Sequence, residues 1–234
     1  MFKKGVIVSL ILLVCIAITY LFIGSHLFLV EEIEISNSRL VDEESLSRLS
    51  QCKGKNIFLI PMGALREKIE ENPEVKCTVI RKELPHKLTI EIQKYMPCAF
   101  LNQSALRWSW LAGKIKLAVS KEGVVFPFKE VVTESYPLVI YEKENFPVGE
   151  QWPNLEEAMK AYLAVKNIVP IEIIKVKRND EIFLYIKNTK TEIRMNSGEY
   201  EKKADYLRIL MKELPSKNVK YIDLRFGRDI IVKP

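Results

Sequence analysis

A long apolar segment lies close to the start of the chain. Residues 5–30 contain no Asp, Glu, Lys or Arg, and residues 6–23 are almost wholly Val, Ile, Leu, Phe, Ala and Cys. A helix of about 20 apolar residues is long enough to cross a hydrocarbon core of about 30 Å. A cleaved secretory signal is the alternative, but its apolar region is typically only about 7 to 15 residues long and precedes a small-x-small cleavage motif, which this segment lacks. The pattern therefore favours a single transmembrane helix over residues 5–29.

Charged residues on either side of this segment predict its orientation. Lys3 and Lys4 precede it, whereas Glu31, Glu32 and Glu34 follow it. Basic flanks are retained on the cytoplasmic side of a membrane. We therefore expect residues 1–4 to form a short cytoplasmic tail and everything after the helix to lie outside the cytoplasm.

Residues 30–94 combine strand-like and helix-like patterns. Ile33 and Ile35 alternate with glutamates, and residues 87–93 show the same period of two, which is typical of half-buried strands. Two intervening segments carry helix signals, including the capping residue Asp42. This order predicts a compact α+β domain in which two helices cover one face of a three-stranded sheet. The expected strands span residues 32–35, 75–82 and 87–93, and the expected helices span residues 42–51 and 61–72.

A different pattern follows a boundary at Tyr95-Met96-Pro97. Short apolar runs separated by Gly or Pro predict strands, and two longer segments carry apolar residues at helical spacing. Residues 95–234 are therefore expected to form a β-rich domain with two helices. The predicted strands lie near residues 98–101, 114–119, 124–126, 138–141, 171–177, 182–187 and 192–195, and the predicted helices over residues 155–167 and 199–214.

Two further strands, over residues 221–226 and 229–233, close the chain. The alternation places Ile222, Leu224 and Phe226 on the inward face, with Asp223 and Arg225 pointing away. A final strand often lies at a sheet edge, where unpaired N–H and C=O groups can receive a strand from another protein. A capped or solvated edge is the alternative.

Composition narrows the classes of function. The chain has 234 residues, of which 48% are hydrophobic and 28% charged, as is ordinary for a folded protein. Its formal net charge is +6, but the basic and acidic residues are interleaved along the sequence and form no basic run. This distribution argues against nucleic-acid binding. Cys15 lies in the apolar segment, which leaves Cys52, Cys77 and Cys98 outside it, so at most one internal disulfide can form. Three small, unpaired hydrophobic side chains are the favoured interpretation.

Motifs of enzymes, metal sites and cofactor sites are absent from the sequence. The two histidines, His26 and His86, show no metal-binding spacing, and no phosphate loop, nucleophile elbow or C-x-x-C occurs. Ser50 and Lys53 form an S-x-x-K pair, but chance alone predicts about one such pair, and neither S-D-N nor K-T-G accompanies it. We therefore expect no enzymatic activity, no cofactor and no metal, and instead a role in binding.

The chain resembles the bacterial cell-division family FtsQ/DivIB over essentially its whole length. Residues 30–94 are similar to the polypeptide-transport-associated (POTRA) domain of that family, and the remainder to its β domain. The resemblance gives an α+β protein with one transmembrane helix, a POTRA domain and a β-rich domain with two helices. It rests on Ile33-Glu34-Ile35-Ser36-Asn37-Ser38, Gly54-Lys55-Asn56-Ile57-Phe58, Asn72-Pro73-Glu74-Val75, Arg81-Lys82-Glu83-Leu84-Pro85-His86-Lys87-Leu88-Thr89-Ile90, Lys121-Glu122-Gly123-Val124-Val125-Phe126 and Tyr221-Ile222-Asp223-Leu224-Arg225-Phe226.

This resemblance implies a non-enzymatic scaffold at the division septum in the inner membrane. Members bring the single-pass proteins FtsB and FtsL to the septum and help to regulate septal peptidoglycan synthesis. In the family, the last strands of the β domain receive a strand of FtsB. Arg225 and Phe226 match the family's Arg-aromatic pair, so the resemblance makes Arg225 a charge partner for an acidic side chain and Phe226 an apolar anchor. Ile230, Ile231 and Val232 would form the receiving strand, although the inward face expected for Phe226 also suits a purely structural role.

Two other classes of protein are the alternatives. POTRA domains also occur in protein-translocation and outer-membrane assembly factors, but these typically repeat the domain and attach it to a barrel, whereas this sequence shows one copy and no barrel-length series of strands. A membrane-tethered wall enzyme would depend on Ser50 and Lys53. The short tail of residues 1–4 departs from the many family members that carry tens of cytoplasmic residues, so recruitment through a tail is not expected.

Overall fold

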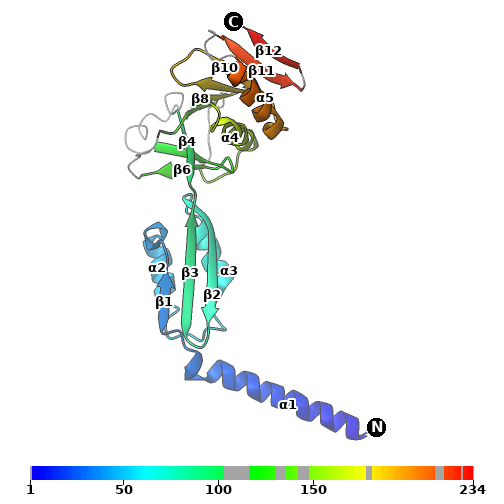
Figure 1. Cartoon of the computed structure of the whole chain (residues 1–234). Coiled ribbons are helices and arrows are strands. Elements are labelled where there is room, and N and C mark those ends of the chain that lie inside the picture. The colour runs from blue at the N-terminus through cyan, green and yellow to red at the C-terminus, as the bar shows by residue number, and fades with distance from the viewer. Residues whose placement is uncertain are drawn as a thin grey trace. The chain divides into compact units, whose positions relative to one another are not determined.

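A computed structural model of the chain describes residues 2–102, 116–129, 135–141, 148–177, 181–213, 219–227 and 229–233. Contacts within the chain divide it into two compact units, Met1–Lys94 and Tyr95–Pro234, here called the N-terminal and C-terminal units. Each unit has its own hydrophobic core. The predicted fold class is confirmed: an apolar helix precedes an α+β unit and a sheet-rich unit with two helices (Figure 1).

The N-terminal unit begins with helix α1 (Phe2–Gly24), whose segment Gly5–Gly24 is long and apolar enough to cross a membrane. The predicted helix over residues 5–29 therefore ends five residues early. Ser25 stops it because its backbone is extended and its hydroxyl accepts a hydrogen bond from the Leu27 N–H, which starts a short 3-10 turn at His26–Phe28.

Three strands and two helices complete this unit. Strand β3 (Lys87–Lys94) is central, and it pairs in parallel with β1 (Glu32–Ile35) and antiparallel with β2 (Val75–Glu83). Helix α2 (Glu43–Ser50) begins at Asp42, whose carboxylate accepts a hydrogen bond from the Ser45 N–H, as predicted. Helix α3 (Met62–Glu70) packs against β2 and α2. Leu88, Ile90 and Ile92 point from β3 into the core, so the predicted alternation is confirmed.

In the C-terminal unit the described residues form one sheet of nine strands, in the order β12-β11-β10-β9-β8-β7-β4-β5-β6. Helices α4 (Pro153–Val165) and α5 (Tyr200–Glu213) pack on each other, and both bury side chains in the main core of the unit. Residues 114, 115 and 214, which belong to predicted elements, lie outside the described residues. The strands are β4 (Pro97–Leu101), β5 (Lys116–Ser120), β6 (Val125–Phe128), β7 (Leu138–Tyr141), β8 (Ile171–Val176), β9 (Ile182–Ile186), β10 (Glu192–Met195), β11 (Tyr221–Phe226) and β12 (Asp229–Lys233).

The four cysteines are free thiols. Cys52 is buried and its Sγ donates to the Arg48 carbonyl at 3.4 Å, whereas Cys77 and Cys98 are half-buried. Burial raises the pKa of the Cys52 and Cys98 thiols. Cys52, Cys77 and Cys98 are therefore small, unpaired side chains that are wholly or partly buried, in agreement with the favoured interpretation of the sequence.

A glycine turn joins the β5–β6 hairpin to the start of α4. Gly123 has a φ of +77°, its carbonyl accepts from the Trp152 N–H at 3.1 Å, and its N–H donates to the Ser120 carbonyl. A Cβ at this position would lie 2.4 Å from the Glu156 backbone nitrogen and 2.7 Å from the Trp152 carbonyl oxygen. Only glycine satisfies both the backbone angle and this close approach.

Gly123→Ala is expected to destabilise the C-terminal unit by about 2–4 kcal/mol, because a left-handed backbone angle and a backbone clash add together. Gly198→Ala is the matched control: Gly198 has a φ of +84°, but nothing lies within 4 Å of its added Cβ. The control should cost only about 1 kcal/mol. Thermal unfolding of the purified chain measures both, and equal losses would contradict the role of the close approach.

Candidate partner-binding edge

Strand β12 forms one edge of the nine-stranded sheet. It pairs with β11 on one side, and no strand of the described residues pairs with its other side. The opposite edge strand, β6, contains Pro127, which lacks a backbone N–H and so blunts that edge against further pairing. Strand β12 has no proline, and three of its five residues are apolar. This open edge, together with the end of β11, is here called the C-terminal edge.

Side chains along β12 alternate between the two faces of the sheet. Ile230 and Val232 are half-buried, and Val232 lies opposite Ile222 on the face that carries the core. Ile231 lies on the outer face, where it is 46% exposed, between the exposed residues Asp229 and Lys233. The predicted strand is confirmed, and it presents backbone groups at its edge and one exposed isoleucine on its outer face.

A β-bulge turns Phe226 to the outer face. Asp223 pairs with Ile231 and Phe226 pairs with Asp229, so three steps along β11 match only two along β12. The extra residue reverses the alternation of side chains beyond it. Phe226 is therefore 56% exposed, and the prediction that it faces inward with Ile222 and Leu224 is wrong.

Arg225 lies within the bulge and binds two carboxylates of its own chain. Its Nε donates to Asp223 Oδ1 at 2.9 Å and its Nη2 to Asp223 Oδ2 at 2.7 Å, a bidentate arrangement, while Nη1 binds Glu181. Lys177 lies 3.5 Å from the second oxygen of Glu181. The guanidinium carbon also lies 5.6 Å from the centre of the Phe226 ring. Arg225 thereby fixes the bulge beside the exposed aromatic ring.

Asp223 is predicted to point away from the core, and it does lie on the outer face, yet it is buried beneath these arginine contacts. Burial by itself raises the pKa of Asp223. Hydrogen bonds from the Arg225 side chain and backbone, with the positive charges of Arg225 and Arg194, outweigh that effect, so the pKa lies below its usual value. Asp223 is therefore an ionised carboxylate at neutral pH.

A buried lysine on α5, which belongs to none of the motifs in the sequence, supports the bulge. Lys203 Nζ donates to the Asn196 carbonyl at 2.9 Å, to Asn196 Oδ1 at 2.7 Å and to the Gly198 carbonyl at 2.7 Å. Asn196 in turn donates to the Arg225 carbonyl at 3.4 Å. Burial lowers the pKa of Lys203. The available signal was a lysine within the apolar stripe of α5, beside Ala204, where a charged residue needs buried acceptors.

Aromatic and basic side chains cover the outer face next to this edge. The Arg194 guanidinium carbon lies 3.9 Å from the centre of the Tyr221 ring and 5.9 Å from that of Phe183. Lys233 Nζ lies 6.0 Å from the centre of the Tyr221 ring. These cation–π contacts shield the outer face of β9–β11 and leave Phe226 and Ile231 as its exposed large apolar residues near the edge.

The S-x-x-K pair shows no catalytic arrangement. The Ser50 hydroxyl donates to the Ser47 carbonyl at 2.6 Å, and both Ser50 and Lys53 are exposed at the end of α2. Among the residues that the structure describes, no three His, Cys, Asp or Glu side chains gather as metal ligands would.

Asp223→Asn should lower the free energy of unfolding at neutral pH by about 1–3 kcal/mol, because Arg225 loses charge-assisted hydrogen bonds. The folded-state pKa of Asp223 is depressed, so its stabilisation is complete above the unfolded pKa of about 3.9 and is lost as pH falls through the folded-state pKa. The difference in melting temperature between wild type and variant should therefore shrink below about pH 4. Asp229→Asn, at an exposed site, should have little effect, and a difference for Asp223→Asn that stays constant with pH would contradict the assignment.

Comparison with known proteins agrees with this architecture. Residues 28–95 match the family model "POTRA domain, FtsQ-type", and residues 110–225 match "Cell division protein FtsQ/DivIB, C-terminal". Among relatives named cell division protein FtsQ, that of Geotalea daltonii is 25% identical over 90% of this chain and 77% of its own length. The relative from Syntrophotalea carbinolica is 25% identical over 94% and 78%, and that from Haemophilus influenzae 23% identical over 79% and 67%. With both models matched in order along a chain of this architecture, the chain belongs to the FtsQ/DivIB family of cell-division proteins.

Proposed function

We propose that this protein is a membrane-anchored, non-enzymatic scaffold of the division machinery. It binds a strand of an FtsB-type single-pass protein at the C-terminal edge, holds the associated FtsL-type protein at the septum, and so helps to regulate septal peptidoglycan synthesis. The observation that carries the proposal is the open, apolar and proline-free edge of β12.

Strand addition suits the chemistry of this edge. An incoming strand would pair its backbone with the N–H and C=O groups on the side of β12 where no strand of the described residues lies, which gives affinity without requiring a particular sequence. Phe226 and Ile231 lie on the outer face beside that edge and offer apolar contact area of the kind that dominates interface energies. Ile230 packs against the core and Val232 pairs with the buried Ile222, so the edge is ordered before the partner arrives.

The guanidinium of Arg225 is the positive charge that this proposal uses for partner binding. Its ion pairs within the chain limit which of its nitrogens a partner can reach. Two of its nitrogens are held by the buried Asp223, whereas Nη1 binds the more exposed Glu181. We propose that an acidic side chain of the partner takes the place of Glu181 at Nη1. Glu181 then turns to Lys177, which already lies within 4 Å of it.

The anchor in this proposal is α1, with the N-terminus in the cytoplasm. Its support is the apolar segment Gly5–Gly24 and the change from Lys3 and Lys4 before the segment to glutamates after it. The part of the N-terminal unit that follows α1, and the whole C-terminal unit, then lie on the outer side of the inner membrane. This placement suits a protein whose partners act on the cell wall.

Photo-cross-linking in living cells tests the partner. With a photoreactive residue at Phe226 or Ile231, we expect the main adduct to be a short single-pass protein with a coiled-coil segment. Ile209 on α5 is the matched control, because it is 57% exposed but lies outside the C-terminal edge. A protein-translocation component or a wall precursor as the main adduct, or equal adducts from Ile209, would refute the proposed interface.

Phe226→Ala should weaken partner binding by about 10- to 100-fold, roughly 1.4–2.8 kcal/mol, because an exposed aromatic anchor is lost. Binding of the purified partner to the full-length chain in detergent measures this, and Ile209→Ala is the control with unchanged affinity. The melting temperature of Phe226→Ala should stay near that of wild type, because the ring is exposed. A large fall in melting temperature would make the residue structural.

Proline substitutions test whether the backbone of β12 pairs with the partner. Successive N–H groups along a strand point alternately to its two sides, so Ile230→Pro and Ile231→Pro remove groups that face opposite sides. One variant should abolish partner binding with a nearly unchanged melting temperature, while the other should unfold the edge. If neither variant separates binding from stability, strand addition at β12 is wrong.

A further inference from the structure

The end of α1 is hydrogen-bonded to the α2–α3 connector, residues 54–59. The Asn56 side-chain amide donates to the carbonyls of Phe22 and Ile23, both at 2.9 Å, and its Oδ1 accepts from the Phe58 N–H at 2.9 Å. Asn56 is buried. Its amide therefore satisfies two of the carbonyls that a helix leaves unpaired at its C-terminus.

Backbone hydrogen bonds bring two loops of the N-terminal unit to this helix end. The Val30 N–H donates to the Lys55 carbonyl at 3.0 Å, and the Ile57 N–H donates to the Phe28 carbonyl at 2.8 Å. The Glu31 N–H donates to the His86 carbonyl at 3.0 Å, which places the β2–β3 turn beside the same segment. The connector and this turn thus lie within a few residues of the point where the apolar helix stops.

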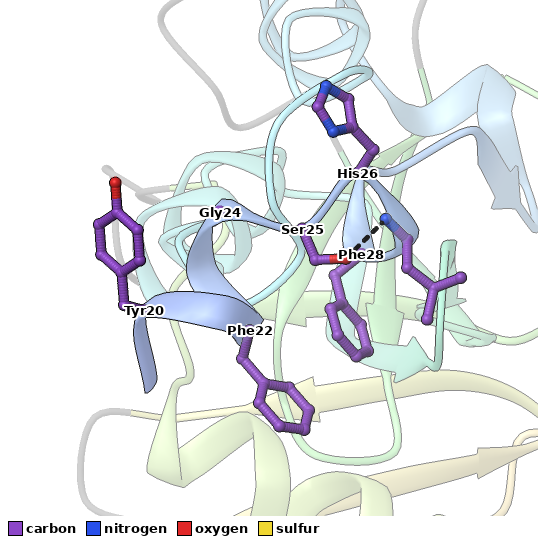
Figure 2. Close-up of a pocket in the computed structure, with 7 residues that line it drawn as sticks. Tyr20, Phe22, Gly24, Ser25, His26 and Phe28 are labelled. Carbon is purple, nitrogen blue, oxygen red and sulfur yellow. Dashed lines mark hydrogen bonds between the residues drawn. The ribbon is translucent and has the colours of Figure 1, made fainter. Parts of the chain in front are cut away.

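An aromatic cluster joins the helix to the connector. The rings of Phe22 and Phe28 stack with centroids 5.1 Å apart, and Phe58 meets Phe28 edge-on at 5.2 Å. Figure 2 shows the hollow next to this cluster, with Phe22 and Phe28 on its wall and the hydrogen bond at Ser25 that turns the chain out of α1. These ring contacts place the aromatic side chains of the helix end and of the connector against each other.

Large apolar side chains on these loops are exposed. Leu59 is 63% exposed, Phe58 43% and Leu84, in the β2–β3 turn, 58%. Leu27, in the 3-10 turn after α1, is exposed as well. These four residues, Leu27, Phe58, Leu59 and Leu84, are here called the membrane-proximal tip. Exposed apolar side chains gathered at one end of a domain indicate a surface that is covered in use.

We propose that the membrane-proximal tip inserts into the boundary between headgroups and acyl chains of the bilayer that α1 crosses. The inference rests on the proposed anchoring of α1. The occupant is a lipid surface because the tip is continuous with a membrane-spanning helix, and its loops are tied to the last carbonyls of that helix. At that depth, aromatic and aliphatic side chains contact lipid instead of water. The backbone of the loops that carry them keeps its hydrogen bonds within the protein.

Charge is not the basis of this contact. Lys53 and Lys55 are exposed near the tip, but so are Glu31 and Glu32, so the local charges balance. Insertion should therefore depend on apolar area and be similar in zwitterionic and anionic bilayers. Strong dependence on anionic lipid would instead indicate headgroup binding by the lysines and would overturn the proposal.

A photoreactive benzophenone side chain at defined positions tests the insertion. The full-length chain is placed in nanodiscs of phosphatidylethanolamine and phosphatidylglycerol, or of phosphatidylcholine alone, and lipid adducts are counted by mass spectrometry. Ile11, inside α1, is the positive control, and Ser38, an exposed residue beyond the far end of β1, is the negative control. Positions 58, 59 and 84 should each give at least about fivefold more adduct than position 38 in both lipid mixtures.

The controls separate this inference from the anchoring on which it rests. No adduct at Ile11 would refute the membrane anchor itself. A second outcome is lipid adduct at Ile11, with adduct at Phe58, Leu59 and Leu84 no higher than at Ser38. That result would support the membrane anchor and refute insertion of the tip. As a second measurement, Leu59→Asp should reduce the adduct at position 58 severalfold and leave that at Ile11 unchanged, because a carboxylate is costly at that depth. Unchanged adduct at position 58 would also overturn the proposal.

Discussion

An open sheet leaves two edge strands, and each exposes backbone donors and acceptors that attract further strands. The C-terminal unit treats its two edges differently. Pro127 removes a donor from β6, whereas β12 keeps every N–H and carries three apolar residues. Because only one side of β12 pairs with a strand of the described residues, the contacts on that paired side must hold it in place. Pairing with β11 and half-burial of Ile230 and Val232 hold its inner side.

The bulge in β11 determines which side chains lie on the outer face of the sheet next to that edge. Without the extra residue, Phe226 would share the core face with Leu224, and the outer face would present little apolar area. A bulge leaves backbone groups outside the regular ladder, and here Asn196 reaches one of them, the carbonyl of Arg225. The buried ammonium of Lys203 fixes Asn196 in turn. An exposed aromatic ring on the outer face is thus supported by a polar network that begins inside α5.

Local periodicity explains why the elements could be predicted and their pairing could not. The alternation in residues 87–93 and the cap at Asp42 act within a few residues, so strand β3 and helix α2 follow from sequence. The order of nine strands depends on contacts between distant residues, which no local pattern encodes. The alternation predicts the wrong face for Phe226 because a period of two holds only as far as a bulge. The hydrogen bonds of Asn56 could not be predicted either, because their acceptors are backbone carbonyls more than 30 residues away.

Charge at the C-terminal edge restricts the kind of contact that the proposed partner could make there. Two carboxylates, Asp223 and Glu181, contact two basic side chains, Arg225 and Lys177. The net charge of this cluster is therefore close to zero. In the proposed complex, a partner carboxylate would gain little from long-range attraction to such a cluster and would have to displace Glu181 to reach the guanidinium. In the proposed complex, affinity would therefore come mainly from backbone pairing along β12 and from burial of Phe226 and Ile231. Backbone pairing does not require particular side chains, so the proposed contact places few constraints on the sequence of the edge.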